Sequence, residues 1–129
     1  MNTIQHIGLC VRDLDKTLAW YAKWFGFIEV KRFEKPEFEV KGAVISLAGQ
    51  SIEILAPYNP VVSFVETAGI VKTLAHLGLN HMAIGVDDVA KLYLDLKASG
   101  ISMVTELVDG RFFFCRDPDG TVLEIKRAG

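Results

Sequence analysis

The spacing of apolar residues predicts the same two elements at the start of each half of the chain. Short runs of alternating side chains end at Val11 and at Val86, and alternation of this kind is typical of strands. The period then lengthens to that of a helix in DLDKTLAWYAKWFGF and DDVAKLYLDLKASGI, with Gly26 and Gly100 as helix ends. Each stretch opens with aspartates that can cap the first helical turn, Asp13 or Asp15 in the first half and Asp87 or Asp88 in the second.

Short β-rich runs follow each predicted helix. In the first half they are FIEVKRF (27–33), AVISLA (43–48) and SIEILA (51–56), with Gly49-Gln50 as a hairpin turn. In the second half they are ISMVTEL (101–107), RFFFCR (111–116) and TVLEIK (121–126), with Asp117-Pro118-Asp119-Gly120 as a four-residue turn. The predicted order is therefore β-α-β-β-β, repeated twice.

This internal repeat predicts one α+β domain over residues 1–129, built from two βαβββ modules. The modules are predicted over residues 1–56 and 79–129, and residues 57–78 are predicted to be a linker with one or two short helices. A repeat of this kind favours a pseudo-twofold arrangement, in which equivalent side chains converge near the axis.

Length and composition narrow the class of protein. The chain has 129 residues, of which 50% are hydrophobic, so it can form a core of its own. A formal net charge of -2, with both signs interspersed, lacks the basic excess of a nucleic-acid binder or of a membrane-surface protein. No signal peptide or membrane-spanning run is visible, and two cysteines are too few for a disulfide framework, so we expect a reduced, cytoplasmic protein.

Two histidines and two glutamates occupy equivalent steps of the repeat. His6 and His81 lie 75 residues apart, and each opens one of the first predicted strands. Glu53 and Glu124 each lie between two apolar residues in the last predicted strand of their half, in the sequences Ile-Glu-Ile and Leu-Glu-Ile. Strand alternation places the histidines on faces with small neighbours, which are Gly8, Cys10, Ala83 and Gly85.

A metal site accounts for this arrangement better than two separate ion pairs. An unpaired carboxylate is costly to bury, and two that face each other also repel. A divalent ion bound by two imidazoles and two carboxylates removes that conflict and leaves positions for water or substrate. The predicted ligands are His6, Glu53, His81 and Glu124. In the alternative interpretation the histidines are structural and each glutamate pairs with a Lys or Arg, Lys126 being a candidate for Glu124.

Three stretches resemble the vicinal oxygen chelate superfamily: HIGLCVRDLDKTLAWYAKWFGF, HMAIGVDDVAKLYLDLKASGI and DPDGTVLEI. That superfamily includes glyoxalase I, methylmalonyl-CoA epimerase, extradiol dioxygenases, and fosfomycin and bleomycin resistance proteins. The resemblance spans nearly the whole chain and implies two βαβββ modules that form a half-open sheet cup with helices outside, in a homodimer. It also implies that the family's metal positions fall on His6, Glu53, His81 and Glu124.

Two histidines with two glutamates look most like glyoxalase I, with methylmalonyl-CoA epimerase close to it. The resemblance then implies a metal-dependent lyase or isomerase acting on a small α-oxygenated carbonyl compound. In such enzymes the metal polarises the substrate oxygens and stabilises an enediolate, while a glutamate, here Glu53 or Glu124, moves the proton. The cofactor is a divalent ion, Ni, Co, Zn, Mn or Fe(II). Two alternatives stay open, an epimerase of an acyl thioester and a ligand-sequestering protein of the bleomycin-resistance type.

Overall fold

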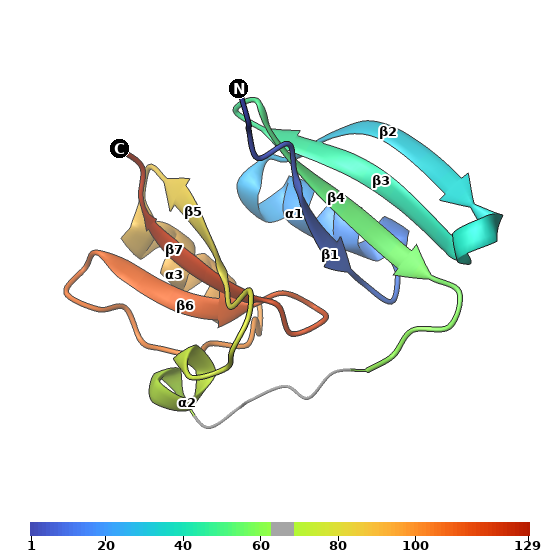
Figure 1. The fold of residues 1–129 in the computed structure, drawn as a ribbon. Helices are drawn as coiled ribbons and strands as arrows, with labels where there is room; N and C mark the ends of the chain where they lie inside the picture. The colour runs from blue at the N-terminus through green and yellow to red at the C-terminus, as the bar shows by residue number, and fades with distance from the viewer. Residues whose placement is uncertain (63–68) are drawn as a thin grey trace. The chain divides into compact units, whose positions relative to one another are not determined.

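The computed structural model of the chain describes residues 1–62 and 69–129 (Figure 1). Its contacts divide the chain into two compact units, Met1–Val62 (the first unit) and Ser63–Gly129 (the second unit). The boundary falls inside the stretch 57–78, and residues 63–68 of that predicted linker lie outside the described residues. In the described part of the chain, no helix is long and apolar enough to cross a membrane.

The first unit is a four-stranded sheet with one α-helix packed on it (Figure 1). Its elements are β1 (Ile7–Cys10), α1 (Leu14–Phe25), β2 (Ile28–Lys35), the short 3-10 helix η1 (Pro36–Phe38), β3 (Val40–Leu47) and β4 (Gln50–Pro57). The strands lie in the order β1-β4-β3-β2. β1 runs parallel to β4, and the other neighbours are antiparallel.

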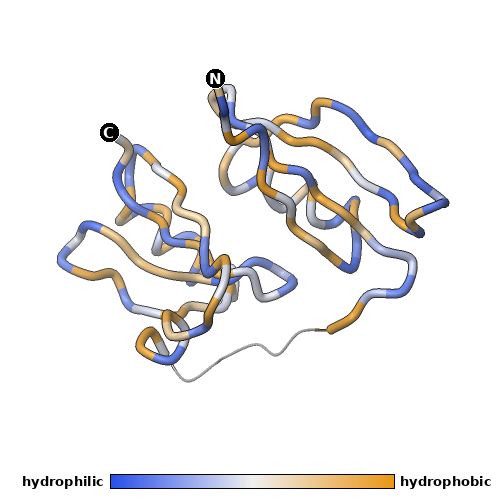
Figure 2. The backbone as a smooth tube through the Cα atoms, viewed as in Figure 1, coloured by the Kyte–Doolittle hydropathy of each residue, from blue (hydrophilic) through white to orange (hydrophobic). Residues whose placement is uncertain are grey.

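One face of this sheet forms a core with α1. The helix contacts β3 and β4, and the buried side chains come from the helical stripe and from alternate strand positions. They include Leu18, Tyr21, Ala43, Ile45, Ile52 and Ile54. Full burial of one large apolar side chain stabilises the fold by about 1.5–3 kcal/mol. Along β4 the buried residues Ile52, Ile54 and Ala56 alternate with more exposed ones, so one face of this strand packs in the core; Figure 2 shows the hydropathy along the backbone.

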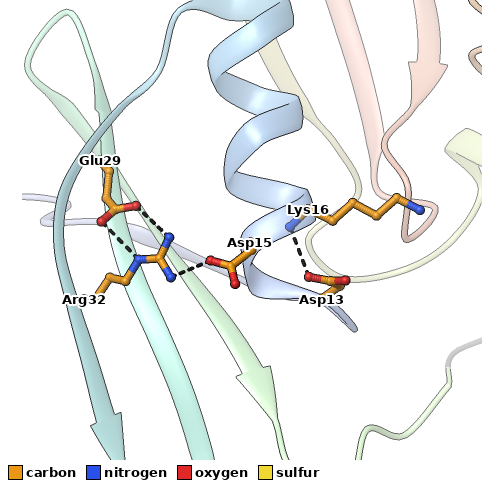
Figure 3. A network of polar contacts seen from close by, with 5 residues as sticks. All are labelled: Asp13, Asp15, Lys16, Glu29 and Arg32. Carbon is orange, nitrogen blue, oxygen red and sulfur yellow. Dashed lines mark hydrogen bonds and ion pairs between the residues drawn. The ribbon is translucent and has the colours of Figure 1, made fainter.

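Both ends of α1 are fixed by residues that the sequence indicates. Asp13 Oδ1 accepts a hydrogen bond from the backbone N–H of Lys16 at 3.0 Å (Figure 3), so Asp13 rather than Asp15 is the cap. Gly26 has a φ of 81° and follows the last helical residue, as predicted. The helix is therefore set by local signals that are independent of the rest of the fold.

Arg32 joins β2 to the first turn of α1 (Figure 3). Its guanidinium donates to Glu29 Oε2 at 3.0 Å and to Asp15 Oδ1 at 2.5 Å. The hydrogen bond to Glu29, followed by the one to Asp15, raises the pKa of the Arg32 guanidinium. Since these side chains are exposed, water and salt screen the ion pairs, and the pairs contribute little to stability.

The turn between β3 and β4 lies one residue earlier than predicted. Ala48 and Gly49 form it, with φ values of 50° and 81°, in place of the predicted Gly49-Gln50. Positive φ at both central residues is the pattern that matches the twist of a two-residue hairpin. Gln50 instead pairs with Leu47 as the first residue of β4.

The second unit repeats this plan with a smaller sheet. Its elements are α2 (Ile70–Leu74), β5 (Met82–Val86), α3 (Val89–Ala98), β6 (Phe112–Arg116) and β7 (Val122–Arg127). The strands lie in the order β5-β7-β6, and β5 runs parallel to β7. Asp88 caps α3 through the backbone N–H of Lys91 at 3.0 Å, and Gly100 follows its end with a φ of 79°. The predicted turn at 117–120 is present, because the Gly120 N–H donates to the Asp117 carbonyl at 3.0 Å.

The strand predicted over residues 101–107 is wrong. The N–H groups of Val104 and Thr105 both donate to the Phe114 carbonyl, and the Phe114 N–H donates to the Thr105 hydroxyl. A side-chain oxygen thus takes the place of a backbone carbonyl as acceptor. Among the described residues, the stretch 101–107 pairs with β6 through an isolated bridge, Met103 with Cys115, and forms no continuous ladder. The predicted α+β class is confirmed, with three α-helices and two small open sheets among the described residues.

Candidate functional site

His6 and Glu53 lie side by side in the first unit. His6 directly precedes β1, and Glu53 lies in β4, where the parallel register sets Gly8 opposite Glu53. Imidazole Nε2 of His6 lies 3.8 Å from Glu53 Oε1, and 38% and 26% of the two side chains are exposed. His6 and Glu53 have 46 residues between them in the sequence, so the pairing of β1 with β4 is what brings them close together.

His81 and Glu124 form the same pair in the second unit. His81 directly precedes β5, and the register sets Ala83 opposite Glu124 in β7. His81 Nε2 lies 3.5 Å from Glu124 Oε1, and 30% and 19% of the two side chains are exposed. The ring of Phe114, which stands opposite Glu124 in β6, packs edge-on against the imidazole at 5.3 Å between centroids. This contact limits rotation of the imidazole.

A carboxamide beside each histidine fixes the imidazole. Gln5 Oε1 lies 3.0 Å from His6 Nδ1, and Asn80 Oδ1 lies 2.8 Å from His81 Nδ1. The Asn80 amide nitrogen donates to the backbone carbonyls of Thr73 and His76, so its oxygen must face the histidine. With an amide oxygen at Nδ1, the neutral imidazole carries its proton on Nδ1 and its lone pair on Nε2. In that form Nε2 of each histidine is the nitrogen that can bind a metal, and it lies on the side of the glutamate.

Neither glutamate has a Lys or Arg as ion-pair partner among the described residues. Lys126, the candidate from the sequence, makes no ion pair with Glu124 in that part of the chain. Each carboxylate is instead partly withdrawn from water beside an imidazole. When that imidazole is neutral, its Nε2 lone pair does not attract the carboxylate, and a cation placed between the two is favourable.

The donor geometry of each pair fits a divalent ion. Two ligands on neighbouring coordination positions, each about 2.0–2.2 Å from the metal, lie about 3–3.5 Å apart. The separations of 3.8 and 3.5 Å are close to that range, and small side-chain rotations close the difference. Imidazole nitrogen with carboxylate oxygen is a donor set for Ni, Co, Zn, Mn or Fe(II). Within either unit, the described residues add no third His, Cys, Asp or Glu to a pair.

The first unit also contains a pocket of about 370 Å³ on the sheet face that carries Glu53. Gly42 on β3 makes room for the ring of Phe33, which lines this pocket. An ideal Cβ on Gly42 would lie 2.4 Å from Phe33 Cζ, so the ring occupies the space that a side chain would take. The residues that line the pocket are Phe33, Lys35, Phe38, Val40, Glu53, Leu55 and Pro57.

The structure thus places the four candidate residues as two pairs, one in each unit. Sequence reasoning missed Gln5 and Asn80, although the chain carries a signal for them. They lie 75 residues apart, the same interval as the two histidines that they precede. It also missed the pocket, which depends on a cross-strand contact between Phe33 and Gly42.

Known proteins match this chain over almost its full length. The family model described as Glyoxalase/Bleomycin resistance protein/Dioxygenase superfamily matches residues 3–125. A probable lactoylglutathione lyase of Vibrio parahaemolyticus is 31% identical over 95% of this chain and 88% of that protein. The mitochondrial methylmalonyl-CoA epimerase of Homo sapiens is 26% identical over 99% of this chain and 75% of that protein. A lactoylglutathione lyase of Arabidopsis thaliana is 28% identical over 96% of this chain, which spans 44% of that longer protein.

Solved structures show the same fold. Glyoxalase I of Leishmania major, described as trypanothione-dependent, has a TM-score of 0.78 at 23% identity, over 98% of this chain and 87% of that one. The fosfomycin resistance protein FosX of Listeria monocytogenes has a TM-score of 0.70 at 23% identity, over 100% and 93% of the two chains. A FosX variant has been crystallised with Mn(II) and a dihydroxypropylphosphonic acid.

Proposed function

Because the chain belongs to the Glyoxalase/Bleomycin resistance protein/Dioxygenase superfamily, we propose that it is a metal-dependent lyase or isomerase of the glyoxalase I type. Its substrate is a small α-oxygenated carbonyl compound, such as a hemithioacetal. The observation that carries the proposal is the repeated His–Glu pair, in which an adjacent carboxamide turns imidazole Nε2 toward the carboxylate. The similarity to proteins named as lactoylglutathione lyases supports this reaction type.

In this proposal His6, Glu53, His81 and Glu124 hold one divalent ion. One pair alone supplies only two side-chain ligands, fewer than the three or four that catalytic metal sites commonly take from protein. The bound ion supplies a Lewis acid that polarises the substrate oxygens and stabilises the negative charge that develops on them. The family resemblance favours a homodimer as the working form.

One of the two glutamates takes the proton from the carbon next to the carbonyl and returns it to the neighbouring carbon. Glu53 is favoured for this role because it lines the pocket of about 370 Å³ in the first unit, which is large enough for a small carbonyl compound. Glu124 then serves mainly as a ligand.

Substitution of the glutamates by glutamine tests the proposal. Glu53→Gln and Glu124→Gln keep size and an oxygen ligand but remove one charge and one possible base. Metal content, measured by elemental analysis of the purified chain, should fall without being abolished, and the circular dichroism spectrum should be unchanged. Turnover of a hemithioacetal should fall by about 10²–10⁴-fold in at least one variant, as is typical when a general acid or base is lost.

Asp109→Asn is the matched control, since it removes one carboxylate from an exposed turn of the second unit. This variant should keep both metal content and turnover. If both glutamine variants bind metal and turn over like the wild type, the catalytic proposal is wrong. A chain that purifies without a divalent ion, and binds none, would instead support a ligand-sequestering protein.

An epimerase of an acyl thioester is the second candidate. It is favoured by the similarity to the human methylmalonyl-CoA epimerase over 99% of this chain. The same carboxylates would move a proton on the carbon next to the thioester carbonyl, so the glutamine variants affect both reactions alike. Solvent deuterium exchange into an acyl thioester, compared with turnover of a hemithioacetal by the same preparation, separates the two candidates.

A further inference from the structure

We propose that the pocket of the first unit binds ligands with an apolar body and an anionic end, and that Lys35 binds the anion. The inference deepens the proposed function because it assigns a class of substrate to the space beside Glu53. Binding of the anionic end depends on residues of the first unit alone, so it can be tested without metal and without turnover.

The body of the pocket is apolar, and we refer to the surface formed by its lining residues as the trough. The strand register arranges its lining in rows across the sheet, with Phe33, Gly42 and Leu55 in one row. The next row holds Lys35, Val40 and Pro57. Gly42 has no side chain, and the Phe33 ring occupies the space beside it. This lining favours aliphatic or aromatic groups and offers few hydrogen-bond partners.

Lys35 provides a cation at the end of the trough away from Glu53. Its ammonium lies 5.6 Å from the centroid of the Phe33 ring and 6.0 Å from that of Phe38, which hold it over the rim. None of the described carboxylates forms an ion pair with Lys35, and the neighbouring Glu34 hydrogen-bonds the Tyr58 hydroxyl instead. The ammonium is therefore available to an anionic group of a ligand, with aromatic surface on two sides.

The two ends of the trough set the length of the ligand. Glu53 and Pro57 are four residues apart on β4, which corresponds to about 13 Å along the strand. Lys35 stands in the row of Pro57, and its flexible side chain can reach back toward Glu53. A ligand that meets both ends therefore extends on the order of 10 Å, so a reacting carbonyl at Glu53 leaves its anionic group beside Lys35. The substrate class is an α-oxygenated carbonyl compound with an apolar chain that ends in a carboxylate or a phosphate.

Calorimetric titration of the full chain after removal of metal by a chelator tests this inference. The probes are octanoate, octan-1-ol and octylamine, which share one apolar chain and differ in the end group. Octanoate should bind more tightly than octan-1-ol, and octylamine, whose ammonium can pair with Glu53 instead, should bind no less tightly to Lys35→Ala than to the wild type. Lys35→Ala should weaken octanoate about five- to tenfold, in the range expected for a charge-assisted contact at a partly exposed site, and should leave octan-1-ol unchanged. Lys35→Arg should retain most of the affinity for octanoate.

Lys41→Ala is the matched control because it removes the same charge from the same sheet. Lys41 follows Val40 on β3, so strand alternation directs it to the opposite face, and octanoate binding should not change. A rise in salt should weaken octanoate binding to the wild type and have little effect on Lys35→Ala. Equal binding of octanoate and octan-1-ol, or an unchanged affinity for octanoate in Lys35→Ala, would overturn the inference. That failure would leave the glutamine test of the metal site unaffected, since no metal takes part here.

Discussion

At the scale of single residues, Asn80 connects three parts of the second unit. Its amide nitrogen donates to the carbonyls of Thr73 and His76 near the end of α2, and its oxygen accepts from His81. Gln5 makes the equivalent contact to His6 and lacks the two backbone contacts among the bonds of the described residues. The imidazole of His81 is therefore held more firmly than that of His6.

Asn80→Ala is expected to lower the affinity for a divalent ion by about 10–100-fold, the range seen when an outer-shell partner of a metal ligand is removed. The reason is that the imidazole loses the acceptor that keeps its proton on Nδ1. Gln5→Ala should have a smaller effect, because the Gln5 amide makes no backbone contacts with the described residues like those that hold Asn80. Equilibrium dialysis with Zn²⁺ measures both, with Asn2→Ala as the control. Equal affinities in Asn80→Ala and the wild type would contradict this role.

The two thiols differ in reactivity for reasons that are visible in their surroundings. Burial, and secondarily the charge of Asp117, raises the pKa of the Cys115 thiol to about 12, whereas Cys10 is exposed. Since the thiolate is the reactive form, native protein at pH 8 should react with iodoacetamide at Cys10 alone. Peptide mass mapping should show Cys115 modified only after unfolding. Rapid labelling of Cys115 in native protein would mean that β6 opens readily.

At the scale of elements, the sequence predicts best where the signal is local. The helix boundaries follow from Asp13, Gly26 and Asp88, whose caps act within one turn. The stretch 101–107 alternates like a strand, but the hydroxyl of Thr105 takes the backbone partner that a ladder would need. That hydrogen bond depends on the position of β6, which no local pattern specifies.

The approach of each histidine to one glutamate follows from the repeat, and their union in one site stays a prediction. The repeat places each histidine at the start of a strand and each glutamate on a partner strand, and parallel pairing then brings them together. The pocket could not be predicted, because it requires the Phe33 ring to lie on Gly42 of a neighbouring strand. Register across strands, rather than spacing along the chain, determines that contact.

Gly42→Ala is expected to destabilise the first unit by about 1–3 kcal/mol, the usual cost of adding a methyl group to a packed site. The new Cβ would lie 2.4 Å from Phe33 Cζ and 3.0 Å from the Ile54 carbonyl oxygen, so ring and backbone must both move. Urea unfolding measures the change. Gly8→Ala is the matched control on the same sheet, since the only contact there is 4.0 Å from the Glu53 carbonyl oxygen, and it should be nearly neutral. A neutral Gly42→Ala would mean that the ring moves freely.

At the scale of the whole molecule, a bound ion should stabilise the chain in proportion to its affinity. A divalent ion at a hundredfold excess over Kd adds about 2.7 kcal/mol to the free energy of unfolding. Because the ligands must be deprotonated, protons compete with the ion, and the metal-induced rise in Tm should be large at pH 7.5 and small at pH 5. Differential scanning calorimetry measures the rise. His81→Ala should abolish it, and His76→Ala should leave it intact. An equal rise at both pH values would argue against these ligands.

Each His–Glu pair is complete within one unit, which makes the protein suitable for genetic complementation. His6→Ala disables the first pair and His81→Ala the second, so neither variant alone should turn over substrate. If the pairs of different copies join, an exchanging equal mixture of the two variants contains mixed dimers with one intact site. Such a mixture should recover about a quarter of the wild-type activity. If the pairs of one chain join, the mixture should stay inactive. Two alleles that are each inactive and restore activity together would then show that the active site forms only in the assembled dimer, not within a single chain.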